Sequence, residues 1–177
     1  MKRLPTTKTE NTKARIKRKL LNLFPAYWGT GAKAVFLSSD FKEVQIRLKL
    51  SWRTKNYVGT IFGGSMYAAT DPIYMIQLIE ILGKEFVVWD KSAAIRFLRP
   101  GNKTLFARFL ISDELILNIQ KEIREKKEMD LNLSVDFEDD SGVVYAKVSK
   151  VLYIADKQFY KNKKEKREQI KREKQAQ

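Results

Sequence analysis

The segment from Asn56 to Asp71 carries the residues whose types and spacing are best suited to chemistry. Gly63 and Gly64 open an apolar run, and a tight helix start there would leave backbone N–H groups free to hold a partly negative oxygen. Asp71 is the only carboxylate of this segment. A carboxylate in such apolar surroundings is expected to be mostly desolvated, and a buried acid generally has either a partner or a chemical role.

The sequence contains neither cysteine nor histidine. This composition excludes disulfides, thiol nucleophiles, Cys/His zinc sites and every mechanism that uses histidine as a base. Catalysis by this chain would depend on carboxylates, hydroxyls, lysines, amides or the backbone. No metal site and no cofactor is predicted.

The formal charge of +14 is concentrated at the two ends of the chain. Residues 1–20 carry eight basic residues and one acid, and residues 157–174 carry nine and three. Residues 21–156 are nearly neutral, with 18 basic and 17 acidic residues. This distribution argues against a nucleic-acid groove in the core domain, and the ends are either solvated tails or polyanion-binding tails.

The length of 177 residues fits one domain with two tails. We predict a basic amphipathic segment at 1–30, the domain at 31–156 and a charged tail at 157–177. The longest apolar stretch, Ile73 to Leu82, contains Gln77 and Glu80 and is too short to span a bilayer. With no transmembrane segment and no secretory signal apparent, we expect a cytoplasmic protein.

Residues 13–28 have the spacing of a short amphipathic helix. Its apolar face would consist of Ile16, Leu20, Leu23 and Phe24, with lysines and arginines opposite. Two interpretations are open, because such a helix can pack on the domain or lie on a membrane surface.

Two patterns near the middle of the chain predict the main structural elements. Apolar residues alternate with polar ones from Val44 to Ser51, which is typical of a half-buried antiparallel strand. The apolar run from about Ser65 to Leu82 is too long for a strand and predicts one central helix ending at Gly83. Pro72 cannot donate a hydrogen bond to the carbonyl of Ala68, so a kink is expected beside Asp71.

Further strands are predicted at about 87–98, 104–112, 129–138 and 142–154, with a helix at 113–127 between the two pairs. The tail from Lys157 has no apolar stripe and is an exposed helix or disordered. The order is strand, strand, long helix, two strands, short helix, two strands. An α+β fold, in which an antiparallel sheet of about six strands wraps around the long helix, is the simplest solution because that helix needs burial on most sides.

This element order and the glycine-rich motif resemble the hot-dog fold, specifically the PaaI-like acyl-CoA thioesterases and the related DUF4442 family. The family pattern is an asparagine, a glycine three residues later, then His-Gly-Gly, and an acid eight residues after the first glycine of that pair. The matching positions here are Asn56, Gly59, Gly63, Gly64 and Asp71, and Phe62 stands in place of the histidine. Residues 90–101 resemble the family's third strand and proline turn, and the match covers about residues 33–155.

The resemblance implies roles for these residues and a partner for the chain. The backbone N–H matching Gly63 would polarise a thioester carbonyl, the aspartate matching Asp71 would attack it or activate water, and the amide matching Asn56 would orient that water. The implied substrate is an acyl-CoA or acyl-carrier thioester. The implied assembly is a homodimer, possibly paired into a tetramer, with sites at the interface.

Helix geometry also indicates that a complete site needs at least a dimer. Eight residues of helix span about 12 Å, so Gly63 and Asp71 of one chain cannot both touch one carbonyl. A complete site would therefore combine Gly63 of one subunit with Asp71 of another.

Several other residues are candidates for the site, and each also has a purely structural interpretation. Asp90 could raise the pKa of Asp71 as a second acid, or it could pair with Lys91 or Arg96. Arg99 and Lys103 flank a Pro-Gly turn and could meet phosphates, or they are ordinary surface charges. Met66 and Tyr67 could line an acyl tunnel or belong to the core. Because Phe62 stands in place of the family's histidine, the mouth of the expected pocket has one polar side chain fewer than in the family.

The sequence thus predicts an acyl-CoA thioesterase that yields a carboxylic acid and a free thiol. Two alternatives stay open: a non-catalytic protein that binds acyl-CoA or lipid, and polyanion binding through the basic tails.

Overall fold

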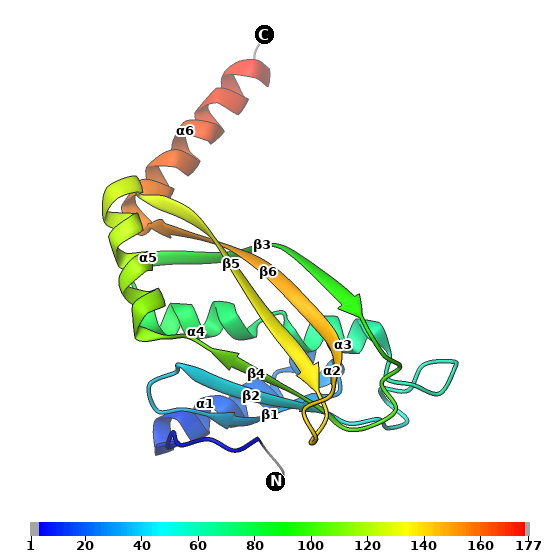
Figure 1. Ribbon diagram of the computed structural model, residues 1–177. Helices are drawn as coiled ribbons and strands as arrows, with labels where there is room; N and C mark the ends of the chain where they lie inside the picture. Colours follow the sequence, from blue (N-terminus) through cyan, green and yellow to red (C-terminus); the bar gives the residue numbers. More distant parts are fainter. Residues whose placement is uncertain (1–3, 176–177) are drawn as a thin grey trace.

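The computed structural model describes residues 4–175, in which an antiparallel sheet wraps around two consecutive helices (Figure 1). The sheet has six strands in the order β1-β2-β4-β5-β6-β3, and every neighbouring pair is antiparallel. The strands are β1 (Ala32–Leu37), β2 (Glu43–Leu48), β3 (Phe86–Phe97), β4 (Leu105–Leu110), β5 (Glu128–Glu138) and β6 (Val144–Asp156). The helices are α1 (Thr12–Leu23), α2 (Pro25–Gly29), α3 (Gly63–Thr70), α4 (Ile73–Leu82), α5 (Asp113–Lys126) and α6 (Lys157–Gln175).

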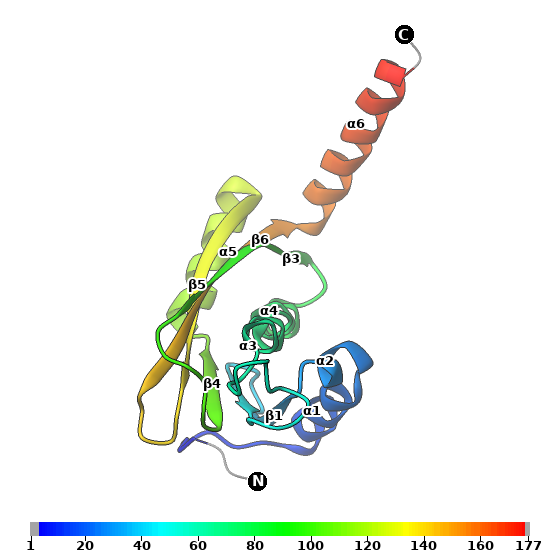
Figure 2. The ribbon, with the colours of Figure 1, turned by 90° about the vertical axis from the view of Figure 1, so that its right-hand side faces the viewer.

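The sheet curves around α3 and α4, which Figure 2 shows almost end-on. This arrangement confirms the predicted α+β class. The core lies between the concave face of the sheet and these helices, where Met66, Ile73 and Leu78 are buried. Tyr74 crosses this core, and its hydroxyl donates to the carbonyl of Ser134 at 2.7 Å.

The predicted central helix is divided into two at Asp71 and Pro72. Asp71 caps the C-terminus of α3, and Pro72 precedes the first residue of α4. The cause is the one expected from the sequence, because proline has no N–H to continue the helical ladder. The break leaves backbone carbonyls at the end of α3 that need other donors.

The strand β2 is more deeply buried than its alternating sequence predicts. Glu43 and Gln45, which point away from the helices, are both buried. The N-terminal segment covers them, since Leu4 N–H donates to Gln45 Oε1 at 2.8 Å and Thr6 Oγ1 to Glu43 Oε2 at 2.7 Å. Arg108 adds a hydrogen bond from Nε to Glu43 Oε1 at 2.9 Å.

The predicted N-terminal helix forms two helices, and its apolar face does not pack on the domain. Phe24 separates α1 from α2, which begins at Pro25. The helix α1 docks on β1 through buried Ala14 and through Asn22, whose amide both donates to and accepts from the backbone of Ala34. The four apolar residues of the predicted packing face are exposed, namely Ile16, Leu20, Leu23 and Phe24.

The C-terminal tail is an exposed helix, one of its two predicted forms. In Figure 1, α6 projects away from the sheet. Only its base is tied down, through Lys157 N–H to the carbonyl of Glu85 and an ion pair between Lys163 and Glu128. Within residues 4–175, no helix is long and apolar enough to cross a membrane.

Candidate active site

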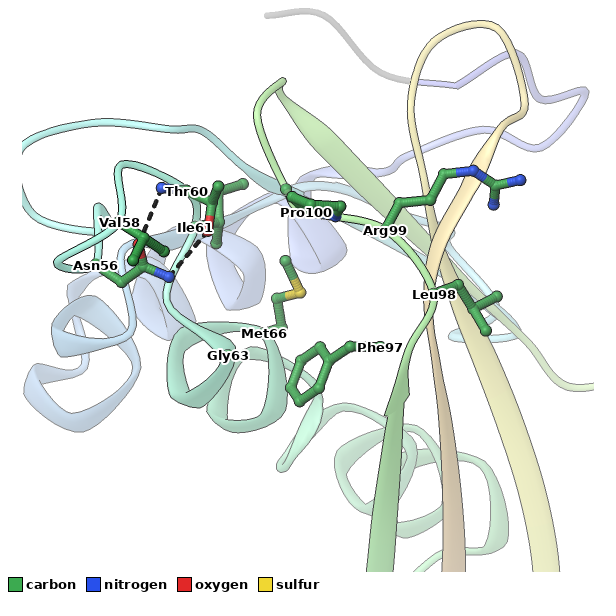
Figure 3. A pocket seen from close by; sticks show the side chains of 11 residues that line it. Asn56, Val58, Thr60, Ile61, Gly63, Met66, Phe97, Leu98, Arg99 and Pro100 are labelled. Atoms are coloured by element: carbon green, nitrogen blue, oxygen red, sulfur yellow. Dashed lines mark hydrogen bonds between the residues drawn. The ribbon is translucent and has the colours of Figure 1, made fainter.

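A cavity of about 660 Å³ lies beside the first turn of α3 (Figure 3). One wall is the loop that precedes α3, and the other is the turn that follows β3. The lining residues are Asn56, Val58, Thr60, Ile61, Gly63, Met66, Phe97, Leu98, Arg99, Pro100 and Gly101.

One backbone hydrogen bond joins the two walls, and a second one holds the segment that leads into α3. Ile61 N–H donates to the carbonyl of Gly101 at 2.8 Å, and Phe62 N–H donates to the carbonyl of Thr54 at 2.7 Å. Gly101 permits this close approach, because a Cβ there would lie 2.7 Å from Met66 Cε and 3.1 Å from Ile61 Cβ. The entry to α3 is therefore held by the proline-glycine turn.

Asn56 and Gly59 close a turn at the rim of the cavity. Gly59 N–H donates to the carbonyl of Asn56, and Gly59 has a φ of 87°, a left-handed value that favours glycine. The Asn56 side chain holds the same loop, since Nδ2 donates to Thr60 Oγ1 and Oδ1 accepts from Thr60 N–H, both at 2.9 Å. One N–H and one lone pair of this amide are left for other contacts.

Gly63 is the first residue of α3, and no side chain caps this end of the helix. The first amides of a helix have no acceptor within the helix, so they can donate to a group in the cavity. The ring of Phe97 lies over Gly63 (Figure 3), and a Cβ on Gly63 would be 2.6 Å from Phe97 Cζ. Met66 lies one turn further along and is buried against the cavity.

Asp71 is at the opposite end of α3, and its side chain is 60% exposed in the single chain. The predicted desolvation of this carboxylate is therefore wrong for the isolated subunit. The reason is its place on the helix: Gly64, Tyr67 and Asp71 follow one another at helical spacing along the side of α3 that the sheet leaves uncovered.

Asp71 and Asp90 are joined by a buried lysine. Lys150 Nζ lies 2.9 Å from Asp90 Oδ2 and 3.4 Å from Asp71 Oδ1, and it also donates to the carbonyl of Asp71. Burial raises the pKa of Asp90 above its ordinary value; the Lys150 ammonium opposes this shift, and the Asp71 carboxylate adds to it. The predicted pairing of Asp90 with Lys91 or Arg96 is wrong, because Asp90 pairs with Lys150 and Lys91 pairs with Asp130.

The remaining candidates lie outside this cluster. The ring of Phe62 is half exposed and packs over Gly64, where a Cβ would be 2.3 Å from Phe62 Cε1. Arg99 lines the cavity, but its guanidinium donates to the carbonyl of Val144 and points away from Gly63 (Figure 3). Lys103 pairs with Asp139 at 3.2 Å and lies beside a separate depression.

The structure therefore brings Asn56, Gly63 and Met66 together at one cavity and places Asp71 and Asp90 in a second cluster. Sequence reasoning missed Lys150 and Phe97. A signal for Lys150 was present, because it occupies an inward position of β6 in line with Val148 and Leu152, where an apolar residue is expected. No comparable pattern distinguishes Phe97.

A curved antiparallel sheet around a central helix with a glycine-rich start defines a hot-dog domain. Residues 12–154 match the domain of unknown function DUF4442, and the chain belongs to that family. The predicted resemblance to DUF4442 and to the hot-dog fold is thereby confirmed. Comparison with curated proteins gave no match.

Solved structures share the fold at low sequence identity. One is a protein of unknown function from Pseudomonas aeruginosa described as a probable thioesterase, with 18% identity, a TM-score of 0.71 and coverage of 85% of this chain and 99% of that one. A thioesterase from Haemophilus influenzae has 12% identity, a TM-score of 0.61 and coverage of 83% and 93%. Thioesterase superfamily member 2 from Mus musculus has 13% identity and a TM-score of 0.59, and the match covers 81% of this chain and 98% of that one.

Proposed function

We propose that this protein hydrolyses an acyl thioester, such as an acyl-CoA, at a site shared by two copies of the chain. The observation that carries the proposal is the placement of Gly63 and Asp71 at opposite ends of α3, one beside a cavity and the other on an uncovered face. Neither end alone has both an oxyanion donor and a carboxylate. Two antiparallel copies of α3 would bring one end of each together.

In the proposed site, the thioester carbonyl accepts a hydrogen bond from Gly63 N–H, and the acyl chain lies against Met66. Asp71 of the partner subunit removes a proton from a water that attacks the carbonyl carbon, or it attacks this carbon itself and forms an anhydride that water then hydrolyses. In both routes the carbon–sulfur bond breaks, and the thiolate leaves and takes up a proton. The developing negative charge on the oxygen is stabilised by the backbone donor. The products are a carboxylic acid and a free thiol.

Uncovered apolar surface supports the dimer. The strand β3 pairs with β6 on one side only, so its other edge has free backbone groups. Tyr67, Ile79, Trp89 and Phe97, which lie on or beside this edge and the central helices, are exposed in the single chain. Pairing of two β3 edges would cover both the edge and the helices.

The test is turnover of short, long and aromatic acyl-CoAs, followed with a thiol reagent. The chain has no cysteine, so the protein gives no background in this assay. We expect the wild type to release thiol and Asp71→Ala to lose activity while light scattering still reports a dimer. The matched control Asp113→Asn, at an exposed carboxylate on α5, should behave as the wild type.

Non-catalytic binding of an acyl thioester is the second candidate, favoured by the aromatic ring that covers Gly63. If no thioester of the panel is hydrolysed but some bind by calorimetry, this candidate replaces hydrolysis. Phe62 in place of a polar residue also fits this alternative.

Polyanion binding through the basic tails is a third candidate, favoured by the exposed cations of α6. Removal of residues 165–177 takes away five of the nine basic residues of the C-terminal tail and keeps the ion pair of Lys163 with Glu128 that anchors α6. Loss of heparin binding in this variant with unchanged thioester turnover would assign the two activities to different parts of the chain. Heparin binding that is unchanged by the truncation would exclude residues 165–177 as the binding site.

A further inference from the structure

Lys150 is a charged residue at a buried position where an apolar residue is expected. It lies on the inward face of β6, opposite Ala93 on β3 and Leu133 on β5, and its side chain is 1% exposed. A buried ammonium is costly unless its donors are all paired. Three acceptors surround this one, matching the three donors of an ammonium: Asp90 Oδ2, Asp71 Oδ1 and the carbonyl oxygen of Asp71.

The contact with the Asp71 carbonyl lies at the break between α3 and α4. Pro72 has no N–H, so helical hydrogen bonding is interrupted here and the C-terminal carbonyls of α3 need other donors. A cation at this end also interacts favourably with the helix dipole. Lys150 therefore fixes the backbone of the residue whose carboxylate we place in the site.

Asp90 holds the lysine from the other side. Its Oδ2 is the closest carboxylate oxygen to Nζ, at 2.9 Å. Within the described residues, its Oδ1 is buried and accepts no hydrogen bond, so the attraction to Lys150 is the compensation visible for this buried charge. The bulge at Lys91 on β3 lies directly beside Asp90, at the shift in register with β6.

We propose that Lys150 is a positioning residue for Asp71, with Asp90 as the counter-charge that keeps the ammonium in place. Lys150 orients Asp71 by its backbone and by one carboxylate oxygen, and it does not engage the other oxygen, which is left for substrate or water. The catalytic consequence rests on the proposed function, whereas the orienting role is a property of the fold.

The test uses the absence of cysteine. In Lys150→Cys, the single thiol can be alkylated during refolding, either with bromoethylamine, which restores an ammonium, or with iodoacetamide, which adds a neutral amide. We expect kcat to fall by about 10- to 100-fold in Lys150→Met and in the amide form, with KM changed less than about twofold, because a misplaced catalytic group costs rate rather than binding. The aminoethylated form should recover most of the lost kcat.

A fold defect is separated from a positioning defect by the double variant Lys150→Met with Asp90→Asn, which leaves no unpaired buried charge. This variant should fold and dimerise as the wild type and still have the reduced kcat. Full kcat in the double variant, or equal recovery by both alkylating agents, would overturn the proposal.

Crystal structures of the wild type and the double variant give a readout that does not depend on turnover. We expect the Asp71 carboxylate to leave its wild-type orientation in the double variant. If the Asp71 carboxylate keeps its orientation in the double variant, the positioning role is refuted, even if the wild type hydrolyses no thioester. If the carboxylate is displaced in the double variant but the wild type hydrolyses no thioester, only the proposed function is refuted.

Discussion

Gly63 begins α3 and Asp71 caps its other end, so the helix separates the two residues by about 12 Å. If they act together, they act across two subunits. Gly63→Val and Asp71→Ala should each be inactive as homodimers, while mixed subunits form heterodimers with one intact and one doubly defective site. Random mixing should restore about one quarter of the wild-type activity, from the statistics of a two-fold dimer.

The measurement is thiol release after co-refolding of the two variants in equal amounts. The control is each variant refolded alone, which should remain inactive. A mixture as inactive as its components would contradict a site shared between Gly63 of one subunit and Asp71 of the other.

A methyl group on Gly63 tests the role of the Phe97 ring. In Gly63→Ala, the new Cβ would lie 2.6 Å from Phe97 Cζ. The ring is half exposed and can swing aside, so we expect the free energy of unfolding to change by less than about 1 kcal/mol. The displaced ring should narrow the cavity and weaken acyl-CoA binding at least about threefold.

Urea denaturation and calorimetry with an acyl-CoA check both parts of this expectation. The companion variant Gly63→Ala with Phe97→Ala should regain binding, because the obstructing ring is absent. If the double variant binds as weakly as Gly63→Ala alone, the ring is not the cause.

The free edge of β3 predicts that a charge placed there blocks assembly. Ala94 lies on this strand and is exposed, so Ala94→Lys should put ammonium groups against each other in a paired edge. We expect a monomer by light scattering, native secondary structure by circular dichroism and no thioesterase activity.

Leu110→Lys on β4 is the control, since Leu110 is an exposed apolar residue on another strand. It should keep the dimer and the activity. A dimer that tolerates Ala94→Lys would show that the chains associate through another surface.

Glu43 predicts a pH dependence of stability. Although burial opposes ionisation, hydrogen bonds from Gln45, Thr6 and Arg108 lower the pKa of Glu43 below its ordinary value of 4.5. A carboxyl with a lowered folded-state pKa stabilises the fold above its unfolded pKa and loses this contribution as the pH falls through the folded-state pKa. Glu43→Gln should therefore be less stable than the wild type at neutral pH, by about 1–3 kcal/mol.

Urea titrations at neutral pH and well below the ordinary pKa of glutamate measure this difference. The gap between Glu43→Gln and the wild type should narrow at acid pH, whereas Glu122→Gln on the surface of α5 should match the wild type throughout. A gap that stays constant with pH would mean that the charge of Glu43 does not contribute.

The features predicted correctly from the sequence are those that depend on local patterns. Alternating apolar residues and the proline at 72 act within a few residues of themselves, so the strands and the helix break were accessible. The exposed face of α1 and the burial of Glu43 depend on segments distant in the sequence. Such long-range contacts produce no periodic pattern of apolar residues in the local sequence.

The residues of the candidate site also fall into those that a local motif predicts and those that depend on long-range contacts. Asn56, Gly59 and Gly63 follow a spacing that the turn and the helix start require, so a motif could mark them. Lys150 is brought to Asp90 by the pairing of β6 with β3, and to Asp71 by the packing of the sheet against α3. The exposure of Asp71 depends on which surfaces are covered in the assembled protein, which a single chain does not determine.

The position of β6 in the sheet has a consequence for synthesis of the protein. This strand joins β3 to the rest of the sheet, and it is the last strand to leave the ribosome. The apolar helices α3 and α4 emerge well before it, so Ile73, Leu78 and their neighbours lack part of the sheet that buries them until β6 has emerged. Chaperones that recognise nascent apolar segments should therefore bind this region before β6 has emerged.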